Sequence, residues 1–142
     1  MALDQVTKWY IVKNFNLFES KVILDGFFNL TYITNTGAAF GILSGTEKWR
    51  NIFFQAITVM ALCGMIYLYK TMRTRSGLFL WGLSLVFGGA LGNFIDRVRF
   101  GYVVDFLDFY VGSWHWPAFN VADSCISLGA TMLAVYFLRE TV

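Results

Sequence analysis

Hydrophobic residues in this chain are gathered into long uninterrupted runs, with the polar positions between them. The clearest run covers residues 49–69 and carries no charge after Arg50. A helix of about twenty residues rises ~30 Å, which is the thickness of the hydrocarbon core of a bilayer. The pattern therefore predicts a membrane-spanning helix at 49–69, and the two other apolar runs predict spans at about 78–95 and 119–138.

Two segments between these runs have a different texture. Residues 21–43 mix β-branched and aromatic residues with turn formers, a pattern typical of short strands. Residues 101–117 resemble them, with a strand expected at 102–104 and with Trp114 and Trp116 as aromatic anchors at the membrane interface. Together they predict a small sheet on the outer face of the membrane.

The start of the chain does not complete a span. The apolar stretch 9–12 is too short to cross a bilayer. We expect either that this end is not a full span or that residues once preceded it. The connection 70–77 carries three basic residues and no acidic one, so the positive-inside rule places it in the cytoplasm. Residues 13–48 and 97–117 are then expected on the outer side.

Composition supports a membrane protein and excludes several functions. The chain is 57% hydrophobic and only 14% charged, whereas soluble domains carry about 25% charged residues. The net charge of +2, without a basic stripe, argues against nucleic-acid binding. Cys63, Cys125 and His115 supply no zinc ligand set of the usual spacing, so we expect neither a metal nor another cofactor.

Asp123 is the most informative ionisable residue, because a charge at membrane depth costs about 2.5–3.5 kcal/mol and needs a reason. Asn120 stands three positions before it, on the same helical face. Asn93, Asp96 and Arg97 repeat this geometry at the end of the preceding span. We expect the two polar faces to meet at one outer level. A purely structural role, in which Asp96 and Arg97 pair with each other or across helices, stays open.

A second carboxylate near Asp123 would permit acid–base chemistry. Asp105 lies in an outer loop that must fold back over the bundle, and Asp108 is its rival. On an extended strand these two side chains point to opposite faces, so only one of them faces Asp123. Two carboxylates that share one proton can split an amide bond, since one activates water while the other protonates the carbonyl oxygen.

Five ordered motifs resemble those of the bacterial lipoprotein signal peptidases (signal peptidase II). They are Asp4-Gln5-x-Thr7-Lys8, Asn35-Thr36-Gly37-Ala38-Ala39-Phe40, Gly88-Gly89-Ala90-x-Gly92-Asn93-x-x-Asp96-Arg97, Val103-Val104-Asp105-Phe106 and Phe119-Asn120-x-Ala122-Asp123. The resemblance implies a metal-free aspartyl endopeptidase that removes the signal peptide from diacylglyceryl-modified prolipoproteins, cutting before the lipidated cysteine. Its catalytic pair would be Asp105 and Asp123. The resemblance therefore favours Asp105 over Asp108 as the partner of Asp123.

The resemblance also implies an architecture and supporting residues. Residues 1–142 would form one integral-membrane peptidase domain: an all-α bundle of four transmembrane helices, the first truncated, with an outer β-cradle and a loop helix. It would be a monomer in the bacterial inner membrane, in contact with lipid and with its site near the periplasmic face. Dyad-supporting or substrate-binding roles fall on Asn35, Gly37, Asn93, Arg97 and Asn120, and structural roles near the site on Asp4, Lys8 and Asp96.

Two other classes of function are compatible with polar residues in an apolar chain, a proton-conducting bundle and a structural assembly subunit. A proton-conducting bundle would use Asp96, Arg97 and Asp123 as a relay, but a relay needs polar groups through the full membrane depth. These candidates all lie toward one interface, and the span at 49–69 has none. A purely structural assembly subunit would leave Asp105 and Asp123 dispensable.

Overall fold

The computed structural model describes residues 1–37, 47–72 and 76–141. The helices are α1 (Ala2–Asn14), α2 (Glu47–Thr71), α3 (Gly77–Phe100) and α4 (Val121–Thr141). The strands are β1 (Ser20–Leu24), β2 (Phe28–Asn35), β3 (Val103–Val111) and β4 (Trp114–His115). In this described part, three helices are long and apolar enough to cross a membrane, at Trp49–Thr71, Gly77–Phe100 and Val121–Glu140. All three predicted spans are therefore present as helices.

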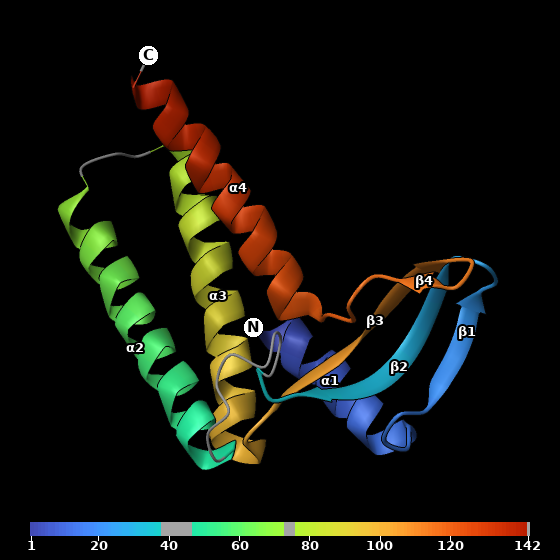
Figure 1. Cartoon of the computed structure of the whole chain (residues 1–142). Helices are drawn as coiled ribbons and strands as arrows, with labels where there is room; N and C mark the ends of the chain where they lie inside the picture. The colour runs from blue at the N-terminus through green and yellow to red at the C-terminus, as the bar shows by residue number, and fades with distance from the viewer. Residues whose placement is uncertain (38–46, 73–75, 142) are drawn as a thin grey trace.

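The three long helices stand side by side, and α3 packs most extensively on α4 (Figure 1). Small residues at this crossing permit the close approach. A Cβ atom added at Gly89 would come within 2.5 Å of the Ala122 carbonyl oxygen, and one added at Gly129 within 2.6 Å of the Gly82 carbonyl oxygen. The glycines of α3 thus permit close helix contact, which is a common role of small residues in membrane-spanning helices.

The sheet is antiparallel, with strand order β1-β2-β3-β4, and it lies beside the bundle near the end of α3 and the start of α4 (Figure 1). The expected strands are therefore found. Residues 38–43 of the predicted strand region lie outside the described residues. The described residues contain no helix besides α1 to α4, so the expected loop helix is not among them.

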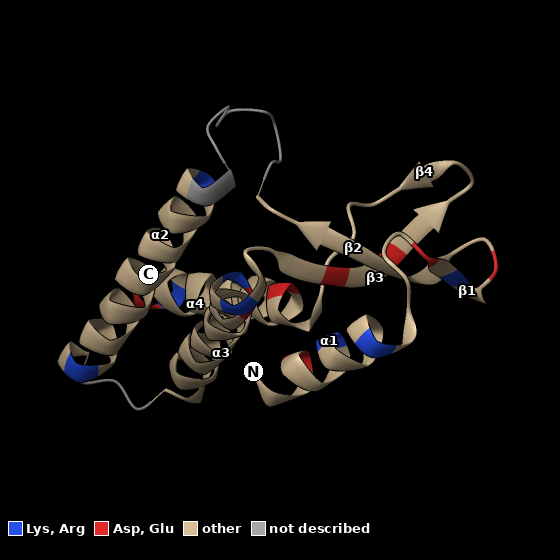
Figure 2. Cartoon of the chain, turned by 90° about the horizontal axis from the view of Figure 1, so that it is seen from below, with Lys and Arg blue, Asp and Glu red and all other residues tan. Residues whose placement is uncertain are grey.

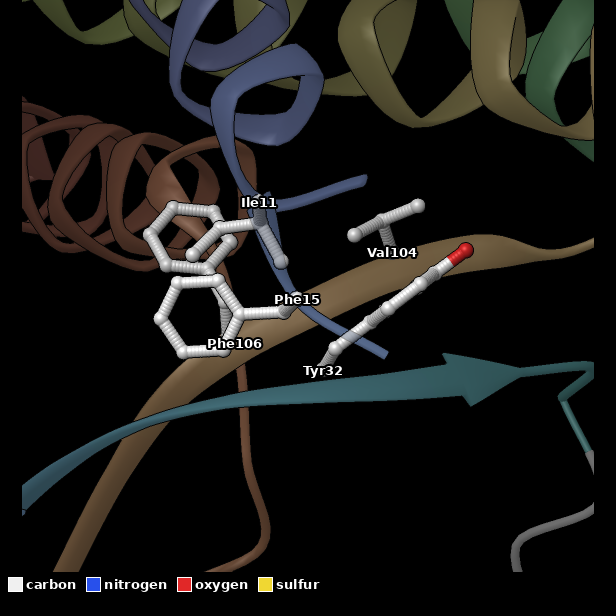
Figure 3. Close-up of a cluster of buried hydrophobic side chains, with 5 residues drawn as sticks. All are labelled: Ile11, Phe15, Tyr32, Val104 and Phe106. Atoms are coloured by element: carbon white, nitrogen blue, oxygen red, sulfur yellow. The ribbon is translucent and has the colours of Figure 1, made fainter. Parts of the chain in front are cut away.

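A buried cluster joins α1 to the inner face of the sheet (Figure 3). Ile11 of α1 and Phe15, the residue that follows α1, pack against Tyr32 of β2 and against Val104 and Phe106 of β3. Alternate residues of a strand point to one face, so Val104 and Phe106 face α1 together while Asp105 between them faces the other way. This packing fixes the position of β3, and hence of Asp105, relative to the helices.

Helix α1 has its polar side inward. Asp4 and Lys8 are buried, with 0% and 3% of their surface exposed, whereas Leu3, Val6 and Trp9 are among its most exposed residues. A helix in water would show the reverse arrangement. Apolar side chains outward and charges inward are expected where the surroundings are lipid.

The distribution of charge on the long helices supports the same environment. Lys, Arg, Asp and Glu lie toward the helix ends, and most of the length of α2 carries none (Figure 2). Large apolar side chains are nevertheless exposed along them, including Met60, Tyr67, Trp81 and Leu138. A soluble protein rarely exposes a continuous apolar surface of this kind. The chain is a multi-pass membrane protein.

Candidate active site

Asn120 and Asp123 cap the start of α4 reciprocally. The Asn120 side-chain oxygen Oδ1 accepts the backbone N–H of Asp123 at 3.0 Å, and Asp123 Oδ2 accepts the backbone N–H of Asn120 at 3.2 Å. This is the geometry of a capping box, in which residues three apart satisfy each other's free N–H groups. The spacing that placed the two residues on one face therefore also fixes the direction of the Asp123 carboxylate.

Asn120 also holds the carboxylate of Asp105. Its Nδ2 donates to Asp105 Oδ1 at 2.7 Å, and Asn35 Nδ2 donates to Asp105 Oδ2 at 3.0 Å. Asn120 is fully buried and Asp105 is 2% exposed. One asparagine side chain therefore bridges the two aspartates, which come from β3 and from α4.

Asn35 is itself oriented by the turn that follows β2. Gly37 has a positive φ of 79° and donates its backbone N–H to Asn35 Oδ1 at 2.8 Å. A side chain at this φ would be strained, which explains a glycine here. Because the Asn35 oxygen accepts from Gly37, its Nδ2 group is left to face Asp105. The structure thus brings Asn35 and Gly37 to the site.

Burial changes the acidity of Asp105. Removal from water raises the pKa of this carboxyl to about 6, and the negative charge of Asp123 acts in the same direction. The hydrogen bonds from Asn35 and Asn120 and the charge of Lys8 oppose the rise. Asp105 consequently holds a proton to higher pH than an ordinary aspartate does.

The polar faces of α3 and α4 meet as expected. Asn93 Nδ2 donates to Asp123 Oδ1 at 2.8 Å, so each oxygen of Asp123 accepts one N–H group. Arg97 and Asp96 form no ion pair with each other, whereas Asp96 does pair across helices, with Lys8 of α1. The Arg97 guanidinium lies 5.4 Å from the ring centroid of Phe54, with Nη1 3.5 Å from the Asn93 carbonyl oxygen.

The partner of Asp96 is Lys8. The Lys8 Nζ atom lies 2.8 Å from Asp96 Oδ2, 3.1 Å from Asp4 Oδ2 and 2.8 Å from Asn93 Oδ1. Asp4 and Lys8 are four positions apart on α1, and no sequence signal identified Asp96 as a second carboxylate on the same cation. Gln5 was also missed as a contact of this cluster, and its Nε2 donates to Asp96 Oδ1 at 2.9 Å.

These carboxylates also connect four elements through backbone groups, α3 to β3 and α1 to α4. Asp96 Oδ2 accepts the N–H of Val104 at 3.2 Å, and Asp4 Oδ1 accepts the N–H of Ala122 at 2.9 Å. Val104 directly precedes Asp105, and Ala122 directly precedes Asp123. The buried ionic cluster therefore fixes the backbone next to each of the two aspartates.

Asp108 lies on the other face of β3, as strand alternation predicted. Asn29 Nδ2 donates to Asp108 Oδ2 at 2.9 Å, and the Nδ1 atom of His115 lies 2.8 Å from Asp108 Oδ1. The contact between His115 and Asp108 was not predicted from the sequence. Asp105 is the carboxylate of β3 that Asn120 reaches, and Asp108 is held elsewhere.

Two adjoining cavities open onto the aspartates. One of about 470 Å³ contains Asp123 with Ser124 and Ser127 of α4 in its wall. The other, of about 280 Å³, contains Asp105 together with residues of β2. Pro117 and Ala118 line both cavities. An extended chain lying across 117–118 would therefore have access to both carboxylates.

Three apolar helices, a sheet at one end and two carboxylates bridged by a buried asparagine define a class of protein. It is a multi-pass membrane protein with a paired-carboxylate site. The family model for signal peptidase (SPase) II matches residues 1–139. The chain belongs to the signal peptidase II family, and it is accordingly a peptidase of the aspartic type.

Relatives and solved structures agree with this membership. The lipoprotein signal peptidase of Syntrophus aciditrophicus is 48% identical over 142 residues, which cover 99% of this chain and 88% of the relative. That of Geobacter sulfurreducens is 46% identical over 140 residues, covering 99% and 87%.

Two solved structures, each titled as a bacterial membrane enzyme structure by the in meso method, are 38% identical with TM-scores of 0.85 and 0.86. The match to the first covers 99% of this chain and 83% of the solved chain. The match to the second covers 97% of this chain and 86% of the solved chain.

Proposed function

We propose that this chain is an aspartyl endopeptidase that removes the signal peptide from diacylglyceryl-modified prolipoproteins, cutting before the lipidated cysteine, with Asp105 and Asp123 as its catalytic pair. The observation that carries the assignment of the pair is the bridge through Asn120, whose Nδ2 donates to the Asp105 carboxylate and whose backbone N–H donates to the Asp123 carboxylate. The relatives' name, lipoprotein signal peptidase, supports the substrate class.

The proposed chemistry needs one carboxyl protonated and one ionised. In this proposal Asp105, whose pKa is raised, supplies the proton, and Asp123 acts as the carboxylate. Asp123 takes a proton from water while the water oxygen attacks the scissile carbonyl carbon, and Asp105 gives its proton to the carbonyl oxygen. The C–N bond then breaks as Asp123 returns its proton to the leaving nitrogen. The hydroxyl proton of the collapsing intermediate goes back to Asp105.

The neighbouring polar residues have supporting roles in this proposal. Asn35, Asn93 and Asn120 hold the carboxylate oxygens in place through the hydrogen bonds already described. Arg97 forms no ion pair within the described ranges, so its guanidinium N–H groups can bind a substrate backbone carbonyl. Preorganised donors of this kind stabilise charge that develops in the transition state.

The finer placement in the membrane is also part of the proposal. The family and the basic connection 70–77 support the bacterial inner membrane, with the site near the periplasmic face. The exposed apolar side of α1 supports a fourth membrane-embedded helix, in contact with lipid. We propose one domain, residues 1–142, acting as a monomer.

Conversion of a precursor tests this function directly. The purified protein is expected to cut a diacylglyceryl-modified prolipoprotein and to leave the same precursor without its lipid uncut, with the products resolved by mass. Equal cutting of both precursors would contradict the lipid-directed specificity. No cutting of either, by protein shown to be folded, would overturn the proposed function.

The dependence of activity on pH follows from the raised pKa of Asp105. Because the proposed general acid must be protonated, kcat/KM is expected to fall as pH rises above about 6. Asn35 donates to the ionised form and lowers the pKa of Asp105, so Asn35→Ala is expected to move this limb to higher pH. A kcat/KM profile from pH 4 to 9 measures both. A limb that stays in place or moves to lower pH would contradict the assignment.

The same pKa has a consequence for stability with a definite sign. A folded-state pKa above the unfolded value means that the native state holds the proton more tightly. The contribution of Asp105 to stability is therefore largest below pH 4 and is lost as pH rises to about 6. Asp105→Asn removes this contribution, so this variant is the control when the free energy of unfolding is measured as a function of pH.

A further inference from the structure

The Lys8 ammonium group has three close acceptors. They are Asp4 Oδ2, Asp96 Oδ2 and Asn93 Oδ1, at 3.1, 2.8 and 2.8 Å. An ammonium group has three N–H donors and no acceptor, so these contacts use its full capacity. Two of the acceptors neutralise its charge, but the third is a neutral amide that also contacts Asp123.

The two ends of an asparagine amide are chemically different, and Lys8 selects between them. Because Lys8 can only donate, the Asn93 oxygen faces Lys8 and the Asn93 Nδ2 group faces Asp123. Turning the amide by 180° would place its NH₂ against the ammonium group and its oxygen against the Asp123 carboxylate. Both new contacts would be repulsive, and both would be costly in a buried site.

We propose that Lys8 is a positioning residue for Asp123, acting through the amide of Asn93. This inference rests on the proposed function, in which Asp123 must present a carboxylate to water. Asp123 Oδ2 is fixed by the cap of α4, so Asn93 is the contact that fixes Oδ1 and the plane of the carboxylate. Lys8 touches no reacting atom in this role.

The competing explanation is that Lys8 only balances the charges of Asp4 and Asp96. The triple variant Asp4→Asn/Lys8→Met/Asp96→Asn separates the two explanations. Asparagine keeps an oxygen to accept the N–H of Ala122 or of Val104, and methionine fills the volume of the lysine stem. The cluster is then neutral and packed, but the Asn93 oxygen has lost its ammonium donor at 2.8 Å and keeps only the longer contact from Asn120 Nδ2, at 3.3 Å.

We expect the triple variant to fold and to bind precursor with a KM within about twofold of the parent. Its kcat is expected to be lower by about 10- to 100-fold, because misplacing a reacting group by about 1 Å costs on that order. The parent for this comparison is the wild type, because Asp4→Asn/Asp96→Asn would leave the Lys8 ammonium group buried without a counter-ion. A charge-balance role predicts no loss of kcat between these two.

A double-mutant cycle tests the route through Asn93. Once Asn93→Ala has removed the amide, the further change Asp4→Asn/Lys8→Met/Asp96→Asn is expected to alter kcat by less than about twofold. An equal loss from this triple change with and without Asn93 would overturn the inference, and so would an unchanged kcat in the triple variant. Lys13→Met, at an exposed lysine of α1, is the matched control.

Two provisions keep the outcome decisive. If the triple variant does not fold, Lys8→Met/Asp96→Asn takes its place and is compared with the wild type, whose cluster has the same net charge of −1. If the wild-type protein does not cut the precursor, the proposed function fails. If the wild type cuts and the kcat values of variant and parent agree, only the Lys8 inference fails.

Discussion

Asp123→Asn is expected to abolish cleavage of a lipidated precursor, lowering kcat by about 10³-fold or more. An amide cannot take the proton from the attacking water, so the activation of the nucleophile is lost. The fold should survive, because the asparagine oxygen can still accept the N–H of Asn120 that Asp123 accepts now. Single-turnover assays at high enzyme concentration measure the residual rate, and thermal unfolding in detergent checks the fold.

Asp105→Asn is expected to have an effect of the same size, because the variant can no longer give a proton to the scissile carbonyl oxygen. Asp108→Asn is the matched control: it is another buried aspartate of β3, and its contacts are Asn29 and His115. This control should retain most of the activity. Cleavage by either Asp105→Asn or Asp123→Asn at a rate near that of the wild type would refute the catalytic pair.

The second large effect is on folding. Lys8→Met as a single change leaves the carboxylates of Asp4 and Asp96 buried without their cation, at 0% and 1% exposure. Removing one partner of a buried ion pair typically costs about 3–5 kcal/mol, since the remaining charge is uncompensated. That is a large part of the stability of an ordinary domain, about 5–15 kcal/mol. We therefore expect a sharp fall in Tm or loss of folded protein.

The triple variant Asp4→Asn/Lys8→Met/Asp96→Asn supplies the control for this prediction. With no buried charge left, most of the lost stability is expected to return, since a neutral well-packed replacement of a buried ionic cluster is often tolerated. Size-exclusion profiles and thermal unfolding in the same detergent compare the three proteins. A Tm for Lys8→Met equal to that of the wild type would mean that the ionic cluster contributes nothing to the fold.

Local patterns predicted the elements of this fold because each depends on neighbouring residues. Apolar runs of spanning length gave the three long helices, and alternation with turn formers gave the outer strands. Within the site, the spacing of Asn120 and Asp123 predicted a shared face, and strand geometry predicted that Asp105 and Asp108 diverge. The first segment was harder to interpret, since its 13-residue helix falls short of a span.

By itself, the sequence determined the spans, the outer strands and a set of polar residues that lipid would not tolerate without a purpose. Only the tertiary structure decided which of these residues touch. Asp96 lies beside Arg97 in sequence but pairs with Lys8, and Asn120 reaches Asp105 across the junction of α4 and β3. The physical reason is that a buried charge takes whichever partner the packing of distant elements brings within about 3 Å, and spacing along the chain does not specify that packing.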